Sequence, residues 1–274
     1  MSSHSSITAE HLALDVGTQR APVVVDVRSD DEFAADPFLI PGSVRRSLTS
    51  VEAWAPALAG KSAVVVCLDG RVSSQGAAAE LRHRGVQARV LEGGFTAWRA
   101  GGNLLTRAAK IPAPDASGRT VWVTRERPKI DRIACPWLIR RFVDPEAIFL
   151  LVEAARVSEV ANRFRAMPFD IEGVFWSHRS DTCTFDTMLT EFGLRSAAFD
   201  RLATIVRGAD TARLDLSPEA SGFLAFSLGL SRLFDDDLVQ LQVGLTFYDA
   251  VYLWCRDAAA ETHNWPSKAV GGKQ

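Results

Sequence analysis

The fold of the first half of the chain is decided by the stretch Val64-Val65-Val66-Cys67-Leu68-Asp69-Gly70-Arg71-Val72-Ser73-Ser74-Gln75-Gly76-Ala77-Ala78. Its β-branched start predicts a strand that is buried on both faces of a parallel sheet. The residues after the loop predict a helix over 73–84, which Ser73 or Ser74 caps and Gly85 ends. Two further apolar runs, at 23–27 and 88–91, predict strands, and strands that alternate with helices indicate an α/β domain.

Cys67 stands where the predicted strand ends and a short loop leads into the helix. Ligands of parallel sheets bind beyond the carboxyl ends of the strands, so this position favours a functional cysteine. Loop amides and the helix dipole would form a cradle that stabilises a thiolate. Gly70 would keep the cradle open, and Arg71 would add a positive charge at its rim. The alternative is a buried cysteine that acts as a small apolar side chain.

Four segments in this region resemble the landmarks of the rhodanese family, in the order that the family has them. The segments are Val25-Asp26-Val27-Arg28 with Glu32-Phe33, then Ile40-Pro41-Gly42-Ser43, the loop after Cys67, and Leu91-Glu92-Gly93-Gly94-Phe95-Thr96-Ala97-Trp98. The resemblance covers roughly 90 residues. It implies a parallel sheet flanked by helices over residues 1–105 and an activity in sulfane-sulfur transfer.

The resemblance also implies roles for individual residues. Cys67 would be the nucleophile that takes sulfur from thiosulfate or a persulfide and passes it to cyanide or a thiol. No cofactor is expected for this chemistry. Asp26 and Arg28 are expected to form a structural pair beside the loop. The loop that binds substrate and persulfide would consist of Leu68, Asp69, Gly70, Arg71, Val72 and Ser73.

Val72 departs from the family pattern, in which Arg or Thr often ends the six-residue loop. We therefore expect weakened binding of thiosulfate and a persulfide or polysulfide as the physiological donor. The related phosphatase and arsenate-reductase sites use Cys-x5-Arg, whereas Ser73 stands six residues after Cys67 here. A phosphate or arsenate dianion would lose its bidentate clamp, so phosphatase activity is disfavoured.

The amino-acid composition changes over residues 101–118, where glycines and prolines indicate a linker with few apolar side chains to bury. We place the linker at 106–118, a second domain at 119–262 and a flexible tail at 263–274. Apolar runs predict two strands in the second domain, and its later part is mostly helical, which makes it α+β. The predicted strands span 121–123 and 148–152, and the predicted helices span 196–208, 218–234 and 238–256.

The second domain resembles the C-terminal domain of the ChrB-type chromate-resistance proteins over nearly its whole length. The segments that carry the likeness are Trp122–Arg125, Asp131–Phe142, Pro168–Asp170, Ser177–Arg179, Cys183–Asp186, Ile205–Thr211, Tyr248–Ala250 and Trp254–Arg256. The resemblance predicts the fold of this half more directly than its chemistry.

Several polar side chains of the second domain stand out against apolar surroundings. The candidate site residues are Arg132, His178, Cys183, Arg207 and Asp210. Histidine, thiolate and carboxylate suit a transition metal, yet no fixed ligand spacing is present, so a metal here stays unknown. The alternative is a hydrogen-bonded histidine with helix-capping aspartates.

A group of arginines near the start of the second domain is a candidate binding site for an oxyanion such as chromate or sulfate. The alternative is surface charge that pairs with Asp131, Asp144 and Glu146. The group consists of Arg125, Arg127, Arg132, Arg140 and Arg141.

Charge and cysteine usage narrow the functional classes. Residues 1–108 carry eleven Lys+Arg and eleven Asp+Glu, and the remainder carries twenty and twenty-two, so no basic excess favours nucleic acid. The four cysteines lie far apart without a C-x-x-C pair, which is typical of reduced thiols in the cytoplasm. No apolar run approaches the roughly 20 residues that span a bilayer, so no membrane partner is expected.

We therefore expect a cytoplasmic sulfurtransferase linked to resistance against chromate or other oxyanions. Sulfur transfer and chromate resistance are chemically related, because chromate resembles sulfate and consumes thiols when it is reduced. One alternative is a binding protein that senses chromate or a metal, with Cys67 as a redox reporter. Another is a scaffold whose first domain only docks partners.

Overall fold

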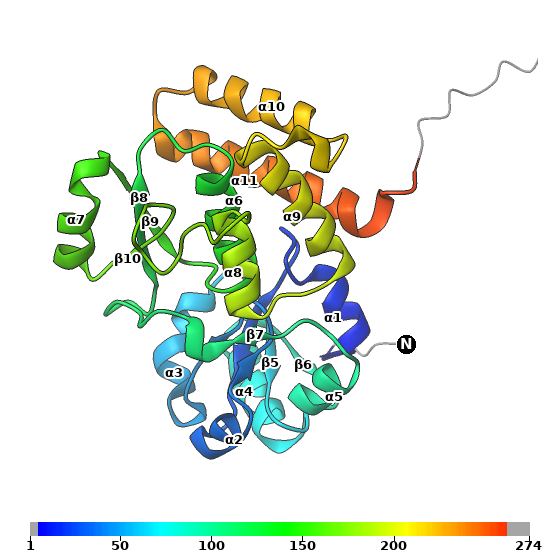
Figure 1. The fold of residues 1–274 in the computed structure, drawn as a ribbon. Coiled ribbons are helices and arrows are strands. Elements are labelled where there is room, and N and C mark those ends of the chain that lie inside the picture. Colours follow the sequence, from blue (N-terminus) through cyan, green and yellow to red (C-terminus); the bar gives the residue numbers. More distant parts are fainter. Residues whose placement is uncertain (1–4, 262–274) are drawn as a thin grey trace, which may run out of the picture.

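The computed structural model describes residues 5–261, which form two units that lie one above the other (Figure 1). The tail predicted at 263–274 lies outside the described residues. The elements of the N-terminal unit are β1 Ser6–Ile7, α1 Ala9–Asp15, β2 Val23–Asp26, α2 Asp30–Ala35, β3 Phe38–Leu39, β4 Val44–Arg45, α3 Val51–Trp54, β5 Ser62–Val66, α4 Val72–His83, β6 Gln87–Leu91, α5 Gly94–Ala100 and β7 Thr106–Arg107.

Strands β1, β6, β5, β2 and β4 form a parallel sheet in that order, with β5 at its centre. Alternate residues of each strand point to opposite faces. Val25 and Val65 pack with residues of α3 and α4, whereas Val24 and Val64 pack with residues of α1 and α5. Helices thus cover both faces of the sheet, which explains why its strands are apolar throughout and confirms the predicted fold class.

Helix α4 confirms the predicted helix to within one residue at each end. The predicted serine cap is wrong, because Arg71 occupies the N-cap position and no side chain caps the helix. Ser74 lies buried in the first turn, and its hydroxyl donates a hydrogen bond to the Arg71 carbonyl instead. Gly85 follows the end of the helix with φ +81°.

The second unit contains a three-stranded parallel sheet in the order β10, β8, β9. Its predicted strands and its three predicted helices are confirmed, whereas α6 and α7 were not predicted. Helix α7 packs on one face of the sheet and α6 and α8 pack on the other. The elements are β8 Val121–Arg125, α6 Asp131–Phe142, β9 Ile148–Val152, α7 Val157–Phe164, β10 Met167–Pro168, α8 Thr184–Phe192, α9 Ala197–Asp210, α10 Ala220–Leu233, α11 Asp237–Leu253 and a π-helical turn Trp254–Ala258.

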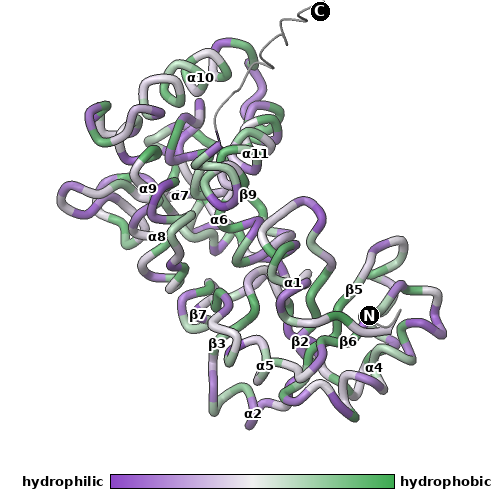
Figure 2. The backbone as a smooth tube through the Cα atoms, turned by 90° about the vertical axis from the view of Figure 1, so that its right-hand side faces the viewer, coloured by the Kyte–Doolittle hydropathy of each residue, from purple (hydrophilic) through white to green (hydrophobic). Residues whose placement is uncertain are grey.

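The first residues of the predicted linker contact both units. Their composition predicts a segment with little to bury, but these residues are paired and hydrogen-bonded. Strand β7 pairs with β3, and Thr106 is buried and donates a hydrogen bond to the Phe142 carbonyl. The same carbonyl accepts the Gly42 N–H from the N-terminal unit. Figure 2 shows the chain passing between the two units at this level.

Within residues 5–261, no helix combines the length and the apolar character that crossing a membrane requires.

Candidate functional sites

The first candidate site is the loop that follows β5. Cys67 is the first residue after this strand, and its carbonyl accepts the N–H of Phe95. The carbonyl of Leu68 accepts the N–H and the hydroxyl of Thr96. The beginning of α5 therefore holds the loop in place. Gly94 has φ +58°, and a Cβ atom there would lie 2.4 Å from the Cys67 carbonyl oxygen, so only glycine fits this close approach.

The sulfur of Cys67 lies just beneath the surface, with 3% of the residue exposed. Its Sγ is 3.1 Å from Ser74 Oγ and 3.6 Å from Asp69 Oδ1. The N–H of Arg71 donates to Asp69 Oδ1 rather than toward the sulfur. Within the described part of the chain, the hydrogen-bond partners of Sγ are thus side chains, and no loop amide donates a hydrogen bond to it. The predicted binding of a persulfide by those amides concerns the outer sulfur and stays a prediction.

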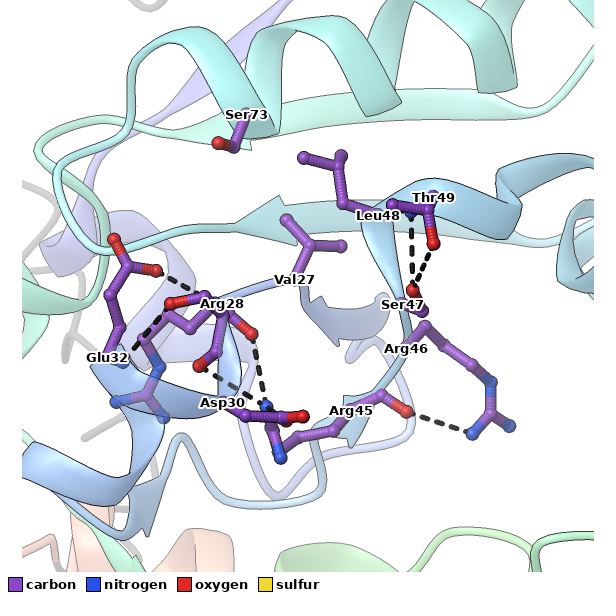
Figure 3. A pocket seen from close by; sticks show the side chains of 11 residues that line it. Val27, Arg28, Asp30, Glu32, Arg45, Arg46, Ser47, Leu48, Thr49 and Ser73 are labelled. Atoms are coloured by element: carbon purple, nitrogen blue, oxygen red, sulfur yellow. Dashed lines mark hydrogen bonds and ion pairs between the residues drawn. The ribbon is translucent and has the colours of Figure 1, made fainter.

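The rim of the loop is open to solvent. Val72 is 84% exposed, and the side chain of Arg71 extends outward, with its Nε 3.8 Å from Asp69 Oδ2. Ser73 faces a pocket of about 500 Å³ beside the loop (Figure 3). Positive side chains of Arg45 and Arg46 also line this pocket.

Asp26 and Arg28 lie where the sequence places them, at the end of β2 beside the loop. Arg28 Nη2 is 2.5 Å from Asp26 Oδ2, both side chains are buried, and Arg28 also stacks on the ring of Phe95 at 3.7 Å. Further donors of Arg28 bind the carbonyls of Asp36 and Phe38. These contacts fit the predicted structural role, because they tie β2 to the chain that surrounds the loop.

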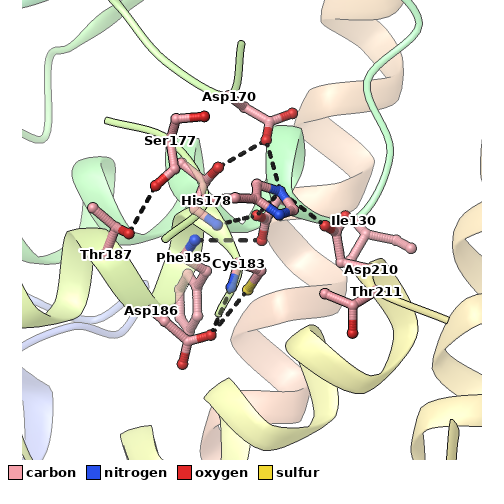
Figure 4. Close-up of polar contacts among 12 residues, drawn as sticks. Ile130, Asp170, Ser177, His178, Cys183, Phe185, Asp186, Thr187, Asp210 and Thr211 are labelled. Carbon is pink, nitrogen blue, oxygen red and sulfur yellow. Dashed lines mark hydrogen bonds and ion pairs between the residues drawn. The ribbon is translucent and has the colours of Figure 1, made fainter. Parts of the chain in front are cut away.

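The second candidate site is a cluster of three aspartates around His178 in the C-terminal unit (Figure 4). Nε2 of His178 is 3.2 Å from Asp210 Oδ2, 3.4 Å from Asp170 Oδ1 and 3.5 Å from Asp131 Oδ2. Asp131 and Asp170 are buried, whereas the His178 side chain is 43% exposed. We call these four residues the Asp–His cluster. Ligand atoms of three of them, Asp131, Asp170 and His178, lie close enough to hold a metal ion.

Each aspartate is fixed by the element that carries it. Asp131 opens α6 and accepts the N–H of Thr184 at 2.5 Å, at the positive end of α8. Asp170 accepts the hydroxyl of Thr184 at 2.8 Å on Oδ1, and its Oδ2 is 3.3 Å from Arg132 Nε. Asp210 ends α9. The four members of the cluster therefore converge from separate segments of the chain.

Burial and mutual repulsion shift the acidity of these groups. Burial, and then the facing Asp210 and Asp170, raise the pKa of Asp131 well above its usual value. Burial and Asp170 likewise raise the pKa of Asp210. The pKa of Asp170 is lowered, because hydrogen bonds from His178 and Thr184 and the charge of Arg132 outweigh burial. The hydrogen bond with Asp170 is the main cause that raises the pKa of His178 to about 9.

The structure brings together four of the five predicted residues of this domain: His178 and Asp210 directly, Arg132 through Asp170, and Cys183 through a side-chain hydrogen bond with Asp131. Arg207 lies beside Asp186 instead, with Nη1 3.7 Å from Oδ1, and Cys183 Sγ is also 3.3 Å from Oδ2 of that carboxylate. Burial raises the pKa of the Cys183 thiol well above its usual value, which disfavours it as a ligand or nucleophile.

Asp131 and Asp170 were missed as site residues, although both lie in segments that resemble ChrB proteins. The predicted oxyanion group does not form one site either. Arg125 and Arg132 both contact Asp170, whereas Arg127 pairs with Asp237 and Arg141 with Asp249. Arg140 donates to the Ala147 carbonyl. Four of these arginines are paired with carboxylates, as the alternative expected, but with other ones than it named.

The parallel sheet with a cysteine at the carboxyl end of its central strand defines the first unit as rhodanese-like, and residues 8–101 match the family model of the Rhodanese-like domain. Residues 122–255 match the model of the ChrB C-terminal domain. The chain therefore joins a rhodanese-like domain to a ChrB C-terminal domain, as predicted.

The chain is 37% identical over 150 residues to Protein ChrB of Cupriavidus metallidurans, which covers 53% of this chain and 44% of that protein. It thus spans less than half of that relative. Similar solved structures include a rhodanese-related protein of Thermoplasma volcanium, with 25% identity, 37% of this chain and 96% of that chain covered, and a TM-score of 0.33. A rhodanese-like domain protein of Staphylococcus aureus has 27% identity, 34% and 90% coverage, and a TM-score of 0.31.

Proposed function

We propose that this protein transfers sulfane sulfur through a persulfide on Cys67, in the cytoplasm, and that the transfer contributes to resistance against chromate or other oxyanions. The observation that carries the proposal is the position of Cys67. Its sulfur lies at the carboxyl end of the central strand, on a loop that α5 holds and that leads directly into α4. A reactive sulfur at this edge of a parallel sheet lies where such sheets bind ligands.

The reaction has two displacement steps. The Cys67 thiolate attacks the outer sulfur of the donor, an S–S bond forms, and the donor leaves as sulfite from thiosulfate or as a thiolate from a persulfide. A thiol or cyanide acceptor then attacks the outer sulfur of the Cys67 persulfide, which restores the Cys67 thiolate. The Cys67 thiol donates to Ser74 Oγ at 3.1 Å, and the Ser74 hydroxyl donates to the Arg71 carbonyl. Once Cys67 has lost its proton, that hydroxyl can turn from the carbonyl and donate to the sulfur.

The charges at the rim favour a persulfide donor over thiosulfate. The carboxylate of Asp69 lies 3.6 Å from Sγ, and it repels thiosulfate, whose two charges lie next to the reactive sulfur, more than a persulfide group, which carries at most one. Val72 offers an exposed apolar side chain where a cation would bind thiosulfate. Because Arg71 pairs with Asp69, its positive charge is only partly available to bind the donor.

Mass spectrometry of the intact chain tests the proposal. After incubation with glutathione persulfide, the wild-type chain should gain about 32 Da on the peptide that contains Cys67, and thiosulfate at equal concentration should label it less. Cys67→Ser should gain nothing. The buried cysteines Cys135, Cys183 and Cys255 are internal controls. No added sulfur with either donor, or equal labelling of Cys67→Ser, would show that the proposal is wrong.

A further inference from the structure

In the Asp–His cluster, three carboxylates converge on one histidine nitrogen. Nε2 of His178 carries at most one proton, yet three carboxylate oxygens surround it at 3.2, 3.4 and 3.5 Å. A single N–H can serve one of these oxygens well, and a charge-assisted hydrogen bond would be about 2.7–2.9 Å long. None of the three contacts is that short. Thr184 donates to Asp131 Oδ2 and to Asp170 Oδ1, but the contacts from Nε2 to the three oxygens are not those of one well-formed hydrogen bond.

We infer that Asp131, Asp170 and His178 bind one divalent transition-metal cation, and that Asp210, whose Oδ2 is 3.2 Å from Nε2 of His178, lies beside the ion. In a tetrahedral site with bonds of about 2.1 Å, neighbouring ligand atoms lie about 3.4 Å apart. The distances from Nε2 to Asp170 Oδ1 and Asp131 Oδ2, 3.4 and 3.5 Å, match that separation, and the ligand atoms of the three residues all lie within 4.8 Å of one another. One imidazole nitrogen with carboxylate oxygens suits Zn²⁺ or Mn²⁺ better than a soft ion that prefers sulfur.

The contacts around the cluster fix the carboxylates in the way that metal ligands are fixed. Oδ1 of Asp170, the oxygen that faces His178, accepts the hydroxyl of Thr184, and its Oδ2 pairs with Arg132. Oδ2 of Asp131, the oxygen that faces His178, accepts the N–H of Thr184, and its Oδ1 accepts the N–H of Phe185. Outer contacts of this kind orient the ligands and raise the affinity for the metal. The half-exposed ring of His178 provides the path by which an ion enters.

A separate observation concerns Thr124, the residue before the end of β8. Its hydroxyl is fully buried and has no hydrogen-bond partner within residues 5–261. Side chains alternate along a strand, so Thr124 faces the same side of the sheet as Trp122, whose ring contacts Phe192 of α8. Buried hydroxyls without a partner are rare. Helix α6, which Asp131 begins, packs on the same face of the sheet, so a hydrated cation held by the cluster would lie on the side that Thr124 faces.

Calorimetric titration of the untagged full chain with Zn²⁺, and separately with Mn²⁺ followed by electron paramagnetic resonance, tests the inference. We expect one ion per chain. Asp210→Asn and His178→Gln should each weaken binding by about tenfold or more. Both side chains are less buried than Asp131, so these variants spare the contact that begins α8. The control is Asp215→Asn, an exposed aspartate that pairs with Arg213 outside the cluster.

The inference is wrong if neither ion binds the wild-type chain, or if both cluster variants bind like Asp215→Asn. Thermal unfolding of each variant without metal shows whether it is folded, and His178→Gln serves as the second test should Asp210→Asn unfold. The result is independent of sulfur transfer, because the readout is the bound ion and the persulfide on Cys67 is measured separately.

Discussion

Asp69 places a carboxylate oxygen 3.6 Å from the Cys67 sulfur, and its side chain is more than half exposed. A unit negative charge about 4 Å away repels the anionic sulfur of a donor by about 1 kcal/mol in water-like surroundings. Asp69→Asn removes that charge and keeps an oxygen that accepts the Arg71 N–H. We therefore expect the rate of persulfide formation at neutral pH to rise about fivefold.

Stopped-flow measurement with glutathione persulfide checks this prediction, and Asp31→Asn is its matched control. Asp31 is an exposed aspartate in the first turn of α2 and makes no contact with the loop. An unchanged or slower rate in Asp69→Asn would mean that the carboxylate supports the reaction, for example by holding the loop.

At the scale of elements, the loop after β5 depends on how closely α5 approaches it. A Cβ atom on Gly94 would lie 2.4 Å from the Cys67 carbonyl oxygen and 2.5 Å from the Gly70 nitrogen. Gly94→Ala should therefore displace the loop, lower the free energy of unfolding by at least about 2 kcal/mol and slow persulfide formation at least tenfold. Urea unfolding and the stopped-flow assay measure the two effects.

Gly76 in α4 is the control for this change, because a Cβ atom there would meet nothing within 4 Å. Gly76→Ala should raise the free energy of unfolding by roughly 0.5–1 kcal/mol, since glycine weakens a helix interior, and should leave the sulfur-transfer rate unchanged. Equal rates in Gly94→Ala and Gly76→Ala would contradict the proposed role of the close contact.

The sequence predicts the elements of the first unit well because their signals are local. The run at 63–67 and the alanines of α4 reveal a strand and a helix without knowledge of the rest. Helix α6 gives no such signal, because its residues from Ile133 to Ile139 are buried on nearly all sides and Pro136 interrupts the pattern. The sequence therefore predicted only two members of the Asp–His cluster, His178 and Asp210. The four residues of the cluster converge from positions 131 to 210, and only the packing of α6, α8 and α9 brings them together.

At the scale of the whole molecule, Asp249 of α11 links the two units. It accepts hydrogen bonds from Gln19 of the N-terminal unit and from Trp137 and Arg141 of α6, each shorter than 2.9 Å. Burial raises the pKa of this carboxyl, but the bonds from Arg141, Gln19 and Trp137 outweigh burial, so its pKa is lowered. The carboxylate form is therefore the one that the fold stabilises.

This lowered pKa predicts how acid weakens the contact between the units. A carboxyl whose pKa is lower in the folded state stabilises the fold above its unfolded pKa of about 3.9, and that stabilisation is lost as the pH falls through the lower, folded pKa. Asp249→Asn should lower the free energy of unfolding at pH 7 by about 2–3 kcal/mol, because it leaves the partly buried Arg141 without its charged partner. The difference from wild type should shrink below about pH 4.

Urea unfolding followed by tryptophan fluorescence at pH 7, 5, 4 and 3 measures this difference. Asp235→Asn, an exposed aspartate in the turn before α11, is the control and should follow wild type at every pH. Because Gln19 contributes one of the bonds, Gln19→Ala should show part of the loss at pH 7, and Asp249→Asn combined with Gln19→Ala should add little beyond Asp249→Asn alone. A difference that persists unchanged at pH 3 would show that Asp249 contributes through its shape rather than its charge.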